Sequence, residues 1–157
     1  MSKRHVDNLT EEQIELNKQW IVELRSGKHK QARGALAVKL EDGTLSYCCL
    51  GIAACWVLGE ELIDETHDLA KSIAIPVLKR NPGEVSRFFA QVEESPTSLL
   101  TYEMRDKLGL TGTAGSSTDN SDGWSFPLAS LNDNLGISFE EIANEIEKSL
   151  QECGVNV

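Results

Sequence analysis

Apolar residues recur at helical spacing near the N-terminal end of the chain, which predicts a first helix. Its apolar stripe consists of Ile14, Trp20, Ile21 and Leu24. Thr10-Glu-Glu-Gln13 has the form of a capping box, a motif that opens helices by satisfying their free amide groups. Gly27 is placed to end the helix, with Arg25 in the last turn. Residues 1–9, ahead of the helix, are expected to form a frayed tail.

The pattern then changes to alternation, which is typical of a strand with one buried face. The alternating apolar positions are Leu36, Val38 and Leu40. Asp42-Gly43 is a strong signal for a two-residue turn, so residues 35–47 are predicted to form a β-hairpin. The next run, 48–58, is almost continuously apolar. It predicts a buried helix that ends at Gly59, although a buried strand gives a similar pattern.

The middle of the chain carries weaker signals. Residues 60–68 are rich in acids and are expected to be a solvated helix or loop. Residues 73–78 contain a proline and are expected to be a short strand or an extended segment at a sheet edge. Residues 84–92 fit a short helix or a strand. Ser95-Pro96 is expected to start a helix that ends at Gly109.

The last third of the chain combines a polar loop with a well-marked helix. Residues 111–123 are rich in Gly, Ser, Thr and Asp and are expected to form a flexible loop. Ser138-Phe-Glu-Glu141 is a second capping box. The helix after it presents an apolar face formed by Ile142, Ile146 and Leu150. We therefore expect one compact α+β domain over residues 1–157, with a β-hairpin or small antiparallel sheet packed by three to four helices.

Composition supports a folded protein and excludes several classes of function. Hydrophobic residues make up 40% and charged residues 25% of the 157 residues, as in ordinary globular domains. The net charge of −10 disfavours binding to long nucleic acids, which are recognised by massed positive charge. No apolar run approaches the roughly 20 residues of a membrane span, and Lys3 and Arg4 lead into polar sequence. We expect a cytoplasmic protein without a membrane partner.

One short segment is basic within this acidic chain. The ten residues from Arg25 to Gly34 contain four cations and no acid. The candidate ligand-binding residues of this segment are Arg25, Lys28, Lys30, Gln31 and Arg33. Arginine and lysine pair with phosphate, and a glutamine amide reads a base or ribose edge. The alternative is a solvated loop whose cations complement acidic helices elsewhere.

Three further residues are candidates for binding a nucleotide. Trp124 and Phe126 follow the polar loop and could stack on a purine, or they could return the chain to the core. Asn132 could bind a base edge, although an asparagine before a capped helix is also a common turn former. A small phosphorylated ligand fits this set better than a polymer.

The cysteines give no metal or catalytic motif. Cys48 and Cys49 are adjacent, and the spacing typical of zinc sites does not occur. We expect Cys48, Cys49 and Cys55 to be small buried residues. A thiol at a helix start could instead have a lowered pKa. The three histidines, His5, His29 and His67, show no spacing that supports a catalytic triad, so no catalytic residue, metal or cofactor is assigned.

Several short motifs stand in a fixed order along residues 14–150. They are Trp20-x-x-x-Leu24-Arg-Ser-Gly27, Gln31-x-x-Gly34, Tyr47-Cys-Cys-Leu-Gly51, Leu131-Asn-Asp133 and Ser138-Phe-x-x-Ile142-Ala143. This order resembles a widespread family of short phage and prophage proteins, most of them without an assigned activity. The chain departs from the pattern at His29, where an aromatic residue is common, and in its longer Ser/Gly loop. The resemblance carries no catalytic residues, but it implies a phage-encoded protein.

Small phage proteins are often inhibitors of host defence, and some trap cyclic-nucleotide messengers. The leading hypothesis is therefore a non-enzymatic anti-defence protein that sequesters a small nucleotide-derived signal in the host cytoplasm. One alternative is an acidic inhibitor that binds a host protein. A third hypothesis is a hydrolase that uses Cys48 or Cys49. A homo-oligomer is compatible with each of them.

Overall fold

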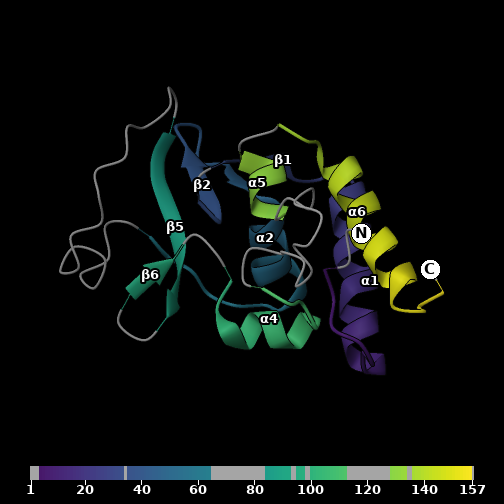
Figure 1. The fold of residues 1–157 in the computed structure, drawn as a ribbon. Helices are drawn as coiled ribbons and strands as arrows, with labels where there is room; N and C mark the ends of the chain where they lie inside the picture. Colours follow the sequence, from purple (N-terminus) through teal and green to yellow (C-terminus); the bar gives the residue numbers. More distant parts are fainter. Residues whose placement is uncertain are drawn as a thin grey trace.

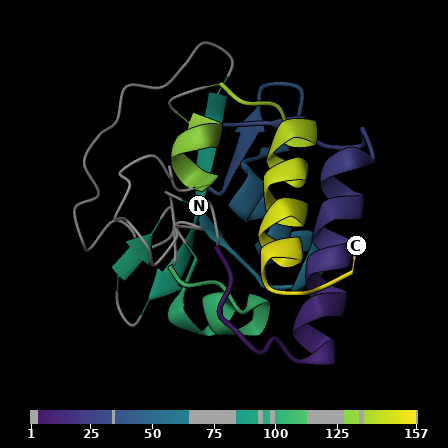
Figure 2. The same cartoon turned by 45° about the vertical axis from the view of Figure 1, so that its right-hand side comes forward.

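Two long helices and a mixed sheet are the main elements of the described chain (Figure 1). The computed structural model describes residues 4–33, 35–64, 84–92, 95–97, 100–112, 128–133 and 136–156. The long helices are α1 (Glu11–Arg25) and α6 (Phe139–Glu152), which pack side by side on one flank of the molecule (Figure 2). The short α2 and α5 lie between this pair and the sheet (Figure 1). The predicted α+β class is confirmed.

Helix α1 begins and ends as its sequence predicts. The Thr10 hydroxyl accepts a hydrogen bond from the Gln13 amide, and the Gln13 side chain accepts one from the Thr10 amide at 2.8 Å. This reciprocal pair is the predicted capping box. Ser26 caps the C-terminal end, and Gly27 follows with a φ of 75°. Helix α6 starts at the Ser138 cap, whose hydroxyl accepts from the Glu141 amide, which is one half of the predicted capping box.

The strands form one sheet in the order β1-β3-β2-β5-β4, with β6 paired to β5. Their bounds are β1 (Lys30–Gln31), β2 (Ala37–Leu40), β3 (Leu45–Tyr47), β4 (Ile63–Asp64), β5 (Glu84–Val92) and β6 (Ser95–Thr97). Strand β1 runs parallel to β3, whereas the other pairings are antiparallel. The sheet is therefore mixed, because the loop after α1 adds a parallel edge strand that the sequence did not indicate.

The predicted hairpin is confirmed as β2 and β3, but its turn is longer than two residues. The Leu40 amide donates to the Thr44 carbonyl, and the Gly43 amide donates to the Leu40 carbonyl. Gly43 has a φ of 87°, a left-handed conformation that glycine adopts without steric cost. The apolar segment after β3 is helical, as expected, and consists of α2 (Cys49–Ile52) and η1 (Ala53–Val57).

Two predictions for the middle of the chain are wrong. Ser95–Thr97 is strand β6, because Pro96 pairs with Gln91 of β5. The helix that was expected to start there is α4 (Tyr102–Leu108); it begins later, at the Thr101 cap, and ends at Gly109. Part of the acidic segment is strand β4 rather than a helix or loop. The ambiguous segment 84–92 is strand β5.

The N-terminal segment is also not frayed where the structure describes it. Arg4 and His5 are buried, and His5 forms a bridge with Leu110. The His5 ring lies between α1 and α6, with Nδ1 2.8 Å from the Ser149 hydroxyl and Nε2 2.7 Å from Asn17 Oδ1. These hydrogen bonds anchor residues that the sequence alone suggested were mobile.

Clusters of buried apolar side chains lie on both faces of the sheet. The larger cluster lies on the helical side and includes Trp20, Leu36, Leu50, Ile52, Leu108, Ile142, Ile146 and Leu150. A smaller cluster on the other face consists of Ala32, Ala35, Val38 and Phe89. Among the described helices, none combines the length and the apolar character needed to cross a membrane. The predicted segment 73–78 lies outside the described residues, as does the predicted loop beyond Gly112.

Candidate ligand-binding site

An exposed tryptophan marks the most distinctive surface of the described chain. Trp56 belongs to the π-helix η1 and is 51% exposed, which is unusual for so large an apolar side chain. We define the Trp56 cluster as the side chains around it, which come from α1, the following loop, β3 and η1. Its members are Glu23, Lys28, His29, Tyr47 and Trp56.

The π-helical backbone explains why Trp56 faces outward. In an α-helix, residue 56 would lie one turn after Ile52 and two turns after Cys49, and both of these residues are fully buried. In η1 the Leu58 amide bonds to the carbonyl of Ala53, five residues earlier. This wider turn moves Trp56 off the buried face. π-Helical segments occur frequently at functional sites.

The exposed indole packs against two other rings, those of His29 and Tyr47. His29 lies between the other two, with its ring centroid 4.6 Å from that of Trp56 and 6.0 Å from that of Tyr47. The Tyr47 and Trp56 rings meet edge to face at 6.2 Å, a favourable arrangement for aromatic pairs. Burial raises the pKa of the Tyr47 hydroxyl. The indole of Trp56 remains 51% exposed despite these ring contacts.

A shared carboxylate holds the polar part of the cluster. Glu23 Oε2 lies 2.6 Å from His29 Nε2 and 3.5 Å from Lys28 Nζ. The hydrogen bond from His29, together with the charge of Lys28, lowers the pKa of Glu23. The Lys28 ammonium lies 5.9 Å from the centroid of the Trp56 ring, within the range of a cation–π contact. A cation is therefore fixed beside an exposed aromatic face.

A groove continues from this cluster along α1. Its volume is about 230 Å³, and it is lined by Glu15, Lys18, Gln19, Val22, Glu23 and Trp56. Val22 is 64% exposed, so the groove joins two exposed apolar side chains. This volume is suited to a single planar ring or one side chain rather than a whole drug-sized ligand.

The basic segment does not form one phosphate cradle. The Arg25 guanidinium points to α6, where it lies 2.9 Å from Glu147 Oε2 and donates to Asn144 Oδ1 at 2.7 Å. Lys28 lies in the Trp56 cluster. Lys30 and Arg33 are exposed and form no ion pair with other described residues. The four cations therefore point to different surroundings, and two of them are already paired with carboxylates.

The predicted candidates Gln31 and Asn132 lie in the interior and bind each other. The Gln31 amide donates to Asn132 Oδ1 and to the Ile137 carbonyl, both at 2.8 Å. Asn132 is fully buried in α5 (Leu128–Asp133), where its amide donates to the Ala32 carbonyl at 2.7 Å. Its Oδ1 also accepts from the Cys49 amide. These contacts give both residues a structural role, which the sequence had left open for Asn132.

Two further residues of the ordered motifs, Trp20 and Gly51, make contacts close to Asn132 and Cys49. The indole of Trp20 donates to the Cys49 carbonyl at 3.0 Å. Gly51 packs directly against the backbone of Leu36. Five residues of the ordered motifs thus meet where α1, β1, α2 and α5 come together: Trp20, Gln31, Cys49, Gly51 and Asn132. Trp124 and Phe126, the remaining predicted candidates, lie outside the described residues.

The adjacent cysteines are structural and poorly suited to nucleophilic catalysis. Cys48 Sγ caps α2 by accepting from the Gly51 amide. Burial raises the pKa of Cys48 to about 12 and that of Cys49 well above its usual value. The expectation that a helix start could lower a thiol pKa is not met, because desolvation outweighs the local amide groups. Within the described residues, no cluster of His, Cys, Asp and Glu could hold a metal.

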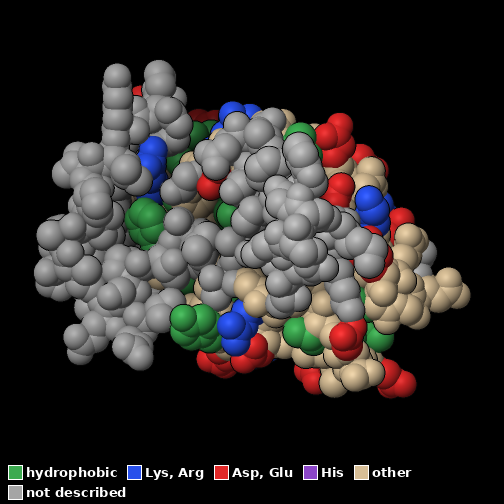
Figure 3. Space-filling model, viewed as in Figure 1, with side chains coloured by type: hydrophobic (Ala, Val, Ile, Leu, Met, Phe, Trp, Pro, Cys, Tyr) green, Lys and Arg blue, Asp and Glu red, His purple; other side chains and the backbone are tan. Residues whose placement is uncertain are grey.

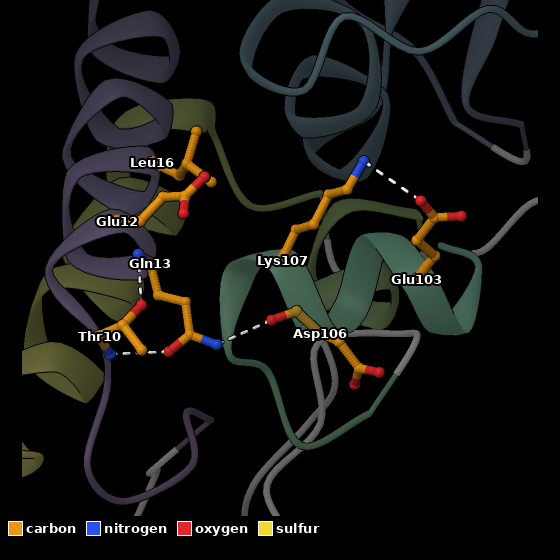
Figure 4. A pocket seen from close by; sticks show the side chains of 7 residues that line it. All are labelled: Thr10, Glu12, Gln13, Leu16, Glu103, Asp106 and Lys107. Atoms are coloured by element: carbon orange, nitrogen blue, oxygen red, sulfur yellow. Dashed lines mark hydrogen bonds and ion pairs between the residues drawn. The ribbon is translucent and has the colours of Figure 1, made fainter.

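A second hollow lies between α1 and α4 (Figure 4). It measures about 340 Å³, and its lining includes the acids Glu12, Glu103 and Asp106. The Gln13 amide crosses it to donate to the Asp106 carbonyl at 2.9 Å (Figure 4). Lys107 pairs with Glu103 on the same helix and with Glu60. The Gln13 contact joins the two helices, and the described residues of this lining include no aromatic ring.

The fold and the Trp56 cluster together define a small α+β protein with a candidate ligand-binding surface. Residues 12–150 match the model of a domain of unknown function, DUF8296. The chain belongs to this family, which covers nearly all of the fold described above. Comparisons with curated proteins and with solved structures gave no match.

Proposed function

We propose that the protein binds a small nucleotide-like ligand at the Trp56 cluster without cleaving it. The observation that carries the proposal is the exposed indole of Trp56, which lies beside the Lys28 ammonium and a groove of about 230 Å³. A nucleobase gains stacking energy on such a ring. The ligand phosphate pairs with Lys28, which exchanges its contact with Glu23 for a stronger charge-assisted hydrogen bond.

The charges around the groove favour a ligand with little negative charge. Lys18 and Lys28 are balanced by Glu15 and Glu23, and the whole chain carries a net charge of −10. A triphosphate would meet repulsion from this surface. A phosphodiester, as in a cyclic nucleotide, carries a single negative charge and fits better.

Two further considerations support sequestration rather than turnover. The candidate nucleophiles Cys48 and Cys49 are buried, and their pKa values are raised. The resemblance to phage proteins adds the proposal that the ligand is a host defence signal, bound in the host cytoplasm. Such a protein needs a tight site and no catalytic group.

The proposal is tested by calorimetric titration with a panel of cyclic and linear nucleotides. Trp56→Ala is expected to weaken binding roughly tenfold to a hundredfold, the range for loss of one base-stacking ring. Trp56→Phe should recover most of the affinity. Tyr102→Ala is the matched control, because Tyr102 is also exposed but lies on α4. Binding that survives Trp56→Ala but is lost in Arg25→Ala/Arg33→Ala would move the site to the basic segment.

The second candidate function is inhibition of a host protein. The observation behind it is the acidic surface, with Asp and Glu side chains along α6 and around α4 (Figure 3), together with the exposed pair Val22 and Trp56. The two functions differ in what is released when the complex is denatured. A sequestered nucleotide is recovered chemically intact after heat denaturation, whereas an inhibitor of a protein shows no nucleotide affinity at all.

A further inference from the structure

The groove beside Trp56 is rich in hydrogen-bond acceptors. Glu15 and Glu23 contribute carboxylates, which only accept hydrogen bonds when ionised, and Gln19 contributes an amide that both accepts and donates. Lys18 is the only cation among the described residues that line the groove. A ring that stacks on Trp56 therefore meets mainly acceptors at its edge, so the groove favours a ring whose edge carries N–H donors.

Glu15 is the carboxylate that is available for this contact. Glu23 Oε2 is already shared by His29 and Lys28. Glu15 is exposed, and it forms no ion pair within the part of the chain that the structure describes. It lies seven residues before Val22 on α1, which is about 10 Å along a helix axis. Glu15 and Val22 both line the groove beside Trp56.

The nucleobases differ sharply in what they offer a carboxylate. Guanine presents a ring N–H and an adjacent amino group on its pairing edge, and both donate to one carboxylate in a bidentate arrangement. Adenine places a ring nitrogen acceptor beside its amino group, which leaves a carboxylate oxygen facing a lone pair. Hypoxanthine keeps the ring N–H but lacks the amino group. A carboxylate thus discriminates among purines through its acceptor character.

We propose that the Trp56 groove selects guanine, with Glu15 accepting hydrogen bonds from the pairing edge of the base. This inference rests on the function proposed above, because it assumes that a nucleobase stacks on Trp56. The ligand class is a guanine nucleotide with a singly charged phosphodiester. Lys28 holds the phosphate, and Glu23 continues to hold His29.

The test compares cyclic 3′,5′-monophosphates of guanosine, inosine and adenosine by titration calorimetry on the full chain. The guanosine compound is expected to bind roughly tenfold to a hundredfold more tightly than the adenosine compound, the discrimination given by a good bidentate pair. The inosine compound should lie between them. Glu15→Gln should remove most of the guanine preference, because its amide group places a donor where a second acceptor is needed.

Matched variants separate the possible outcomes. Glu12→Gln removes a charge from the same helix, but Glu12 lines the other hollow, so the preference should persist. Equal binding of all three compounds, sensitive to Trp56→Ala, would overturn the guanine assignment and leave the proposed function intact. A guanine preference that persists in Glu15→Gln would overturn the role of Glu15. Failure of every nucleotide to bind would overturn the proposed function and this inference together.

Discussion

The backbone of Gly51 in α2 lies directly against the carbonyl of Leu36, so closely that no side chain fits between them. This contact sets the distance between α2 and the strand that follows Leu36. Gly51→Ala is expected to lower the free energy of unfolding by about 3 kcal/mol, because a methyl group forces the backbones apart. Urea denaturation measures the change.

Gly43→Ala provides the comparison for this variant. Gly43 has open space around its Cα but a φ of 87°, so its substitution costs only the backbone strain, about 1 kcal/mol. Equal losses in the two variants would show that close packing at Gly51 is not the dominant cost.

Among the buried polar residues, Asn132 is predicted to lower the free energy of unfolding most when it is substituted. Its side chain bonds to Gln31, Cys49 and Ala32. Asn132→Ala leaves several buried groups without partners and should cost about 3 kcal/mol. Asn144→Ala, which removes an exposed contact with Arg25, should cost less than about 1 kcal/mol. Unfolding curves of the two variants that superimpose would contradict this role of Asn132.

The sequence predicted those elements whose signals are local. The capping box at Thr10 and the N-cap at Ser138 were identified correctly because each hydrogen bond spans three residues. The alternation in the hairpin likewise reflects contacts between strands that are close in sequence. The start of helix α4 was predicted too early, at Ser95. Pairing of β6 with β5 outweighed the helix-start signal of a proline.

The parts that were missed depend on partners far along the chain or on unusual backbone geometry. His5 is held by Ser149, 144 residues away, so nothing near the N-terminus indicates that the segment is ordered. Trp56 was assigned to a buried helix because it lies in an almost continuously apolar run. A comparison of the apolar surface of residues 48–58 with the area that neighbouring elements can cover could have suggested that one ring of this run is exposed.

Stability is expected to fall in mild acid because of His5. Burial lowers the pKa of His5 from 6.5 to about 4, so between these values the unfolded chain binds a proton that the folded chain does not. The free energy of unfolding should therefore decrease as the pH falls from about 6.5 to about 4, by about 3 kcal/mol in total.

Denaturation measured across this pH range checks the prediction. His5→Gln should be less stable at neutral pH but should show a flatter pH dependence. His29→Gln is the control, because His29 lies in the Trp56 cluster, away from Ser149 and Asn17, and the slope due to His5 should persist. An unchanged slope in His5→Gln would assign the acid sensitivity to other groups.

Thiol labelling tests whether a cysteine could act as a nucleophile. Cys48 and Cys49 are buried, whereas Cys55 and Cys153 are partly exposed. We expect no more than two of the four thiols to react with an aromatic disulfide reagent in the native protein, and all of them after unfolding. Rapid native labelling of Cys48 or Cys49, located by peptide mass analysis, would restore the hydrolase hypothesis.

The π-helical turn at Ala53–Val57 makes the exposure of Trp56 a property of backbone geometry as well as of residue type. An α-helix advances about 100° per residue, so in a regular α-helix of the same residues Trp56 would lie one turn after the buried Ile52, and its indole would turn toward the interior. Every side chain of the cluster would still be present in such a chain. Relatives should therefore be compared by the backbone geometry of this turn first, since an aligned tryptophan alone does not preserve the surface.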